Sequence, residues 1–202
     1  SMKIVDTHEH LINPANIKKS WPLDFMLLLN HYADDDIKSG GMPTADFDKL
    51  LKDSLAVQDK WKKIAPYWSN ALNTAYNRSV LLTVQKLFGI DDLNGSTVEV
   101  LSEKIRHSYD HEVDWFNYVL KNKCKIQYVV LDRDDRTYGD PGMFRYVKRF
   151  DNFINIDSWG KIISLSKSFG VDINSVDDLT AALNAAFEKA MKEGIVAVKT
   201  AL

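Results

Sequence analysis

Two histidines near the start of the chain, His8 and His10, have the spacing of metal ligands on a strand. They belong to the segment Ile4-Val-Asp-Thr-His-Glu-His-Leu-Ile12, whose apolar start predicts a short β-strand. Because side chains of an extended strand alternate faces, we expect Asp6, His8 and His10 on one side, where two neutral imidazoles could hold one divalent cation. A His-x-His pair also occurs as an ordinary hydrogen-bonded strand end, and two ligands are fewer than a zinc site needs. Other parts of the chain must therefore decide.

The composition is that of an ordinary globular protein. The chain has 202 residues, of which 45% are hydrophobic and 27% charged, and its formal net charge is -2. Lysines and arginines are scattered, so nucleic acid is not an expected partner. The apolar runs are far shorter than the ~20 residues of a membrane-spanning helix, and no secretory signal opens the chain. The lone Cys124 is expected to be a buried thiol, and the localisation expected is cytoplasmic.

Hydrophobic periodicity and breaker residues predict an alternation of strands and helices. The order predicts a parallel sheet with right-handed crossovers, in one α/β domain over 1–202 that carries a helical insertion over 13–124 and its later strands and helices over 125–202. The predicted strands after the first cover 126–131, 150–156 and 195–202, and the predicted helices cover 23–37, 45–56, 66–88, 97–106, 113–120, 161–169 and 176–193.

Ionisable side chains follow each predicted strand. Asp132 and Arg133 end the second strand, Asp157 ends the third, and Lys199 and Thr200 lie on the fourth. Parallel α/β folds form their sites outside the carboxyl ends of the strands, so these residues are site candidates. Charged residues just past a strand are also common solvated loop residues, and Lys199 could simply face outward.

The segment Val5-Asp-Thr-His-Glu-His-Leu11 resembles the first-strand signature of the amidohydrolase superfamily, metal-dependent enzymes built on a (β/α)8 barrel. The resemblance implies that His8 and His10 bind the metal and that Lys199 corresponds to a fourth-strand lysine, which bridges two metals when carboxylated. It is closer to the branch that contains the uronate isomerases, because a long helical insertion follows the first strand and Pro66-Tyr-Trp68 precedes Leu87-Phe-Gly-Ile90. The fold class implied is a partial (β/α)8 TIM barrel of about four parallel strands.

Two features depart from that family. Its members add a histidine from strand five and an aspartate from strand eight, whereas this sequence reaches only strand four, and uronate isomerases have an Asp-His pair where Lys199-Thr200 stands. The resemblance thus implies about half a barrel, which we expect to be inactive alone. Its open sheet edge would need a cover, such as a second copy in a homo-oligomer.

Three functions remain open. The first is a metal-dependent hydrolase that acts on a small molecule through a metal-activated water, with zinc as the expected ion. The second is aldose-ketose isomerisation of a uronate, in which Arg78, Arg133 or Arg136 would bind the substrate carboxylate. The third is a non-enzymatic α/β module with structural histidines. For the enzyme, the expected roles are metal binding by His8 and His10, catalysis by Lys199 and Asp132, and substrate binding by Tyr76, Arg78, Arg133 and Asp157.

Overall fold

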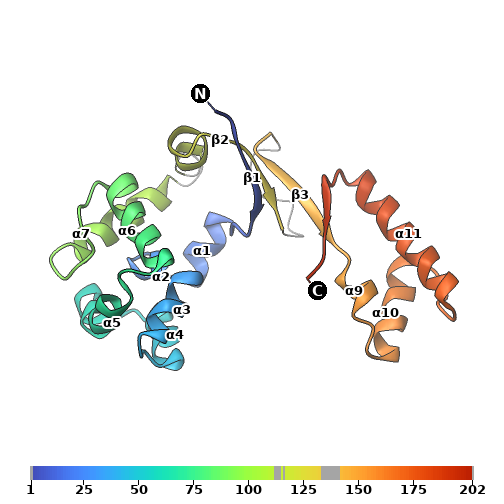
Figure 1. Cartoon of the computed structure of the whole chain (residues 1–202), viewed down its shortest axis with the longest axis horizontal. Helices are drawn as coiled ribbons and strands as arrows, with labels where there is room; N and C mark the ends of the chain where they lie inside the picture. Colours follow the sequence, from blue (N-terminus) through green and yellow to red (C-terminus); the bar gives the residue numbers. More distant parts are fainter. Residues whose placement is uncertain (1, 112–114, 116, 133–141, 202) are drawn as a thin grey trace. The chain divides into compact units, whose positions relative to one another are not determined.

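The computed structural model describes residues 2–111, 115, 117–132 and 142–201. The chain divides into two compact units (Figure 1). We call residues 1–11 with 125–202 the strand unit, and residues 12–124 the helical unit. Each has hydrophobic clusters of its own.

The strand unit contains a four-stranded parallel sheet in the order β1-β2-β3-β4. Val129 and Leu131 of β2 are fully buried, which explains why a run of β-branched and aliphatic residues forms this inner strand. The second predicted strand is confirmed with its bounds unchanged. The four strands are β1 (Ile4–Glu9), β2 (Ile126–Leu131), β3 (Phe144–Arg149) and β4 (Ala197–Lys199).

The third strand lies earlier than the sequence predicted. We expected a strand over 150–156, but β3 ends at Arg149, and Asp151–Ile154 form the short helix α9. Three of the six residues of β3 are basic, and its sequence has neither a continuous apolar run nor a strict alternation, so its strand character is not evident. Phe150 belongs to a buried cluster with Ala186 and Ala190, so its apolar character reflects contact with a helix rather than a place in the sheet. The last strand is also shorter than the 195–202 predicted.

Two longer helices, α10 (Trp159–Phe169) and α11 (Val176–Lys192), connect β3 to β4 (Figure 1). The hydroxyl of Ser175 accepts a hydrogen bond from the backbone N–H of Asp178, so the predicted N-cap of α11 is present. The buried face of α11 consists of Ala182, Ala186 and Ala190, whose small side chains let neighbouring elements approach closely.

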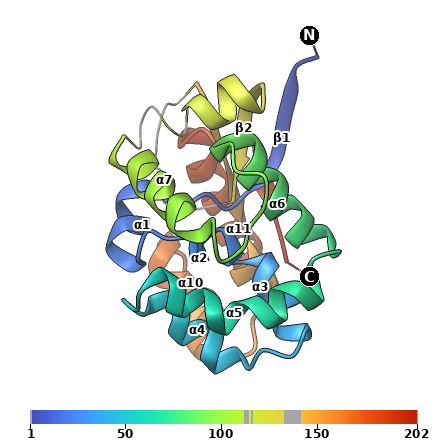
Figure 2. The same ribbon diagram turned by 90° about the vertical axis from the view of Figure 1, so that its left-hand side faces the viewer.

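The helical unit packs its helices around one large core (Figure 2). Helix α3 contacts both α5 and α6. A π-helix, η1, ends the unit. The elements described in the helical unit are α1 (Pro14–Ser20), α2 (Met26–Leu29), α3 (Tyr32–Ser39), α4 (Thr44–Lys52), α5 (Val57–Ala71), α6 (Ala75–Phe88), α7 (Val98–Asp110) and η1 (Tyr118–Lys123).

Several predicted helix bounds in this unit are wrong. The helix expected over 23–37 is two helices, because the backbone at His31 has a φ of 70°, outside the helical range. The helix expected to begin at Pro66 is also two, and α5 runs through that proline. Burial of Trp61, Ile64 and Trp68 along one face of α5 holds the helix together despite the missing N–H.

The end of the helical unit differs from the prediction in another respect. Part of the helix expected over 113–120 lies outside the described residues; residues 115 and 117 are helical, and residues 118–120 belong to η1. Cys124 is exposed rather than buried, because it follows η1 instead of joining β2. None of the helices in the described part of the chain combines the length and apolar character that a membrane span needs.

Candidate metal centre

His8 of β1 and His10, one residue past the end of this strand, lie together at its carboxyl end. Their rings meet edge to face, with centroids 4.6 Å apart. Between Asp6, which pairs with Val129, and Glu9, which pairs with Leu131, β1 holds one residue more than β2. This bulge interrupts the simple alternation that we expected to place Asp6 beside the histidines. Instead, the carboxylate of Asp6 accepts a hydrogen bond from the His8 backbone N–H.

The bulge also brings two carboxyl groups together. Burial, followed by the nearby charge of Asp6, raises the pKa of Glu9 above its ordinary value. The backbone N–H of His10 donates to the Glu9 carboxylate and works in the opposite direction. The acidic pair therefore lies within β1 itself, while the two imidazoles form a separate group.

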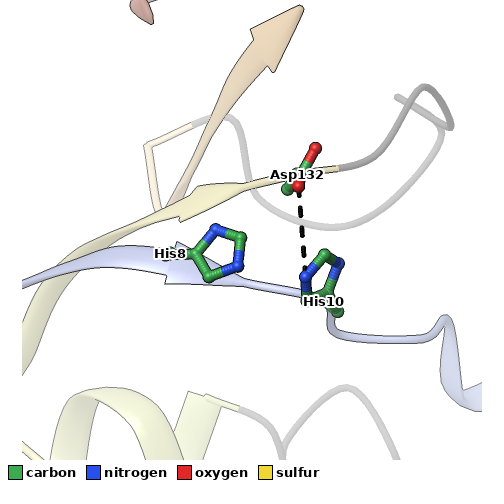
Figure 3. A group of neighbouring side chains, drawn as sticks. All are labelled: His8, His10 and Asp132. Carbon is green, nitrogen blue, oxygen red and sulfur yellow. Dashed lines mark ion pairs between the residues drawn. The ribbon is translucent and has the colours of Figure 1, made fainter. Parts of the chain in front are cut away.

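Asp132, directly after β2, supplies the third donor. Its backbone N–H donates to the carbonyl oxygen of Glu9, which ties the end of β2 to the end of β1. The residue is only 7% exposed, and its Oδ2 lies 4.0 Å from His10 Nε2. Figure 3 shows the two rings and the carboxylate gathered beside these strand ends.

A guanidinium group holds the Asp132 carboxylate. Arg149, the last residue of β3, donates from Nε to Oδ1 at 2.8 Å and from Nη2 to Oδ2. These hydrogen bonds keep the pKa of Asp132 below its ordinary value, although burial acts in the other direction. They also raise the pKa of Arg149. Asp132 is therefore an anion over the whole physiological pH range.

Lys199, the last residue of β4, lies beside His8 and Asp132. Its Nζ lies 3.3 Å from Nδ1 and 3.5 Å from Nε2 of His8, and 3.8 Å from Oδ2 of Asp132. A cavity of about 590 Å³ opens beside His8 and Lys199, and side chains from all four strands line it. A small polar molecule would fit in this space.

The donor set is suitable for a divalent ion. One potential ligand atom each from His8, His10 and Asp132 lies within 4.8 Å of the other two. Among the described residues, these three side chains form the cluster that could hold a metal ion. Three atoms 4.8 Å apart lie about 2.8 Å from their common centre, against about 2.0–2.2 Å for zinc bonds to nitrogen and oxygen. Shifts of less than about 1 Å per side chain would thus form three bonds. Two imidazoles and a carboxylate suit zinc or another transition metal.

The other predicted site residues are placed differently. Asp157 does not end a strand, because β3 ends at Arg149; its carboxylate accepts a hydrogen bond from Lys161 at 2.8 Å, which lowers its pKa. Tyr76 and Arg78 belong to α6 of the helical unit, where the half-exposed ring of Tyr76 stacks on Tyr32. Arg133 and Arg136 lie outside the described residues.

Sequence reasoning missed Arg149 and Asp151. Arg149 donates to Asp132 and, from Nη1 at 3.4 Å, to Asp151, which also accepts from the backbone N–H of Ala201. The signal was present, because Arg149 ends a strand as the other candidates do. The prediction did not include Arg149 because it put the third strand at 150–156, after this residue.

Comparison with known proteins agrees with the architecture. No family model matches the sequence, and neither does any curated protein. Among solved structures, a uronate isomerase from Thermotoga maritima is similar, with a TM-score of 0.72, 18% identity, and coverage of 98% of this chain and 46% of that chain. A uronate isomerase from Bacillus halodurans has a TM-score of 0.65 and 16% identity, with 98% and 48% covered.

The chain thus spans about half the length of the solved structures that it matches. At these identities the likeness shows the fold. The predicted fold class is confirmed: four parallel strands, with many helices, match part of a TIM barrel of the uronate isomerase type.

Proposed function

We propose that this chain contributes a divalent-metal site to an enzyme that interconverts aldose and ketose forms of a uronate. The observation that carries the proposal is the convergence of His8, His10 and Asp132 at the carboxyl ends of neighbouring parallel strands. That is where barrel enzymes place their chemistry, and the solved structures similar to this chain are uronate isomerases. A bound divalent ion would polarise the substrate carbonyl and stabilise the charge that develops on its oxygen.

The residues around the cluster suit an anionic sugar. Isomerisation moves the C2 hydrogen to C1 as a proton and the O2 hydroxyl proton to O1, so the site must hold both carbons beside the metal. Arg149 already contacts two carboxylates. Among the described residues, Lys199 has one carboxylate nearby, that of Asp132 at 3.8 Å, and its partly exposed side chain borders the cavity, so we assign this cation to the substrate carboxylate.

The experiment compares two histidine pairs in the natural protein that contains this sequence. His8→Ala with His10→Ala removes two of the three donors. The control is His107→Ala with His111→Ala, a pair whose rings lie 5.1 Å apart in the helical unit. We expect bound divalent metal and turnover of glucuronate to be lost in the first variant only. Unchanged metal content and turnover in the first variant would refute the proposal.

Hydrolysis is a second candidate, supported by the position of Lys199. Its Nζ lies close to both His8 and Asp132, so a carboxylated Lys199 could add an oxygen ligand to the cluster. The hydrolase hypothesis expects metal-dependent cleavage of simple lactones or esters, and loss of that activity in Lys199→Gln. Turnover of glucuronate without lactone cleavage would favour isomerisation. Wild-type protein without bound metal would favour the non-enzymatic interpretation.

A further inference from the structure

Arg149 lies between two carboxylates and connects three strand ends. Its guanidinium contacts Asp132 after β2 through two nitrogens and Asp151 through the third. Asp151 is held from its other side, because its Oδ1 accepts from the Ala201 backbone N–H at 2.6 Å, just after β4. Both side chains that flank Arg149 are therefore anchored to the sheet.

This contact determines which atoms of Asp132 remain accessible. A two-point contact between a guanidinium and a carboxylate fixes the carboxylate plane and occupies the side of both oxygens that faces the guanidinium. Oδ2 is also the oxygen directed at His10 Nε2, 4.0 Å away, and at Lys199. One lone pair of Oδ2 thus remains directed toward the histidines.

We propose that Arg149 is a positioning residue that presents Asp132 to a divalent ion as a one-oxygen ligand through Oδ2. Asp151 holds the Arg149 guanidinium in the orientation that this requires. The inference rests on the proposed metal site. It follows that Asp132 does not chelate the ion with both oxygens while the contact with Arg149 is intact. Outer contacts of this kind orient metal ligands, and their loss typically weakens metal affinity about 10–100-fold.

The test is titration of the natural protein that contains this sequence, freed of metal, with Co²⁺, followed by its visible absorption. Arg149→Lys keeps the positive charge but cannot make the two-point contact. The matched control is Arg145→Lys on the same strand. The Arg145 guanidinium lies over the Tyr128 ring and forms no ion pair with a carboxylate of the described residues. We expect Arg149→Lys to bind Co²⁺ about 10–100-fold more weakly and with a changed spectrum. Arg145→Lys should keep both, and circular dichroism should match the wild type in each variant.

The outcomes separate the two proposals. Wild-type affinity and spectrum in Arg149→Lys would overturn the positioning role and leave the metal site standing. Failure of the wild type to bind Co²⁺ would overturn the metal site and the inference together. If Arg149→Lys does not fold, Arg149→Gln serves instead, because its single amide group cannot make the two-point contact with Asp132. Unchanged Co²⁺ affinity and spectrum in that variant would then overturn the positioning role.

Discussion

A buried ion pair in the helical unit gives the most demanding test of the structure. The Nζ of Lys60, on α5, lies 2.7 Å from Oδ2 of Asp24, and the side chains are 0% and 4% exposed. The other carboxylate oxygen of Asp24 accepts the Met26 backbone N–H at 2.9 Å. Each charge is therefore removed from water and balanced by the other.

Burial of both charges makes the loss of either partner costly. Removing one partner of a buried pair leaves an uncompensated charge and costs about 3–5 kcal/mol, so Lys60→Met should lower the free energy of unfolding by that amount. Asp24→Leu combined with Lys60→Met removes both charges, and we expect it to be much less destabilised than the sum of the single variants. The control is Lys62→Met on the same helix. Its ion pair with Asp59 is exposed, so the expected change is within about 1 kcal/mol.

Urea unfolding monitored by tryptophan fluorescence measures these energies, because four of the five tryptophans lie in the helical unit. Two results would refute the reasoning. A loss below about 1 kcal/mol in Lys60→Met would mean that the pair behaves like an exposed one. Additive effects in the double variant would mean that Asp24 and Lys60 are not coupled.

Three further predictions concern local devices of the fold. Gly89 ends α6 with a φ of 64°, so Gly89→Ala should destabilise the protein by about 1 kcal/mol and Gly89→Asn by less; equal stability in urea would contradict this. The buried Ser102 hydroxyl accepts the Phe25 N–H, so Ser102→Val should cost about 1–3 kcal/mol, whereas Ser102→Thr, measured alongside, keeps the hydroxyl. The Ser175 hydroxyl holds the pKa of Asp178 below its ordinary value of 3.8. The contact therefore stabilises the folded protein fully above pH 3.8, and this stabilisation is lost as the pH falls through the lower pKa that Asp178 has in the folded state. An NMR titration should show the pKa of Asp178 rising in Ser175→Ala, and an unmoved pKa would contradict that cause.

Elements with strong local signals could be predicted from the sequence. The second strand follows from a run of β-branched and aliphatic residues, and α11 from a capping serine and regular apolar spacing. The His-x-His spacing predicted His8 and His10 as a pair, and the rule that parallel strands end at one edge predicted Asp132 and Lys199 beside them; the structure brings these four residues together. Each of these inferences needs only neighbouring residues and the direction of the strands.

Tertiary structure alone decided where β3 lies and what Arg149 contacts. Phe150 could be a strand residue or a packing residue, and only its burial against α11 distinguishes the two. The bulge in β1 depends on the register with β2, so the sequence of β1 could not show that Asp6 would leave the histidine group. His8, His10 and Asp132 could be chosen by residue type and strand direction, but the guanidinium that orients Asp132 comes from a strand whose position is fixed by contacts with distant residues.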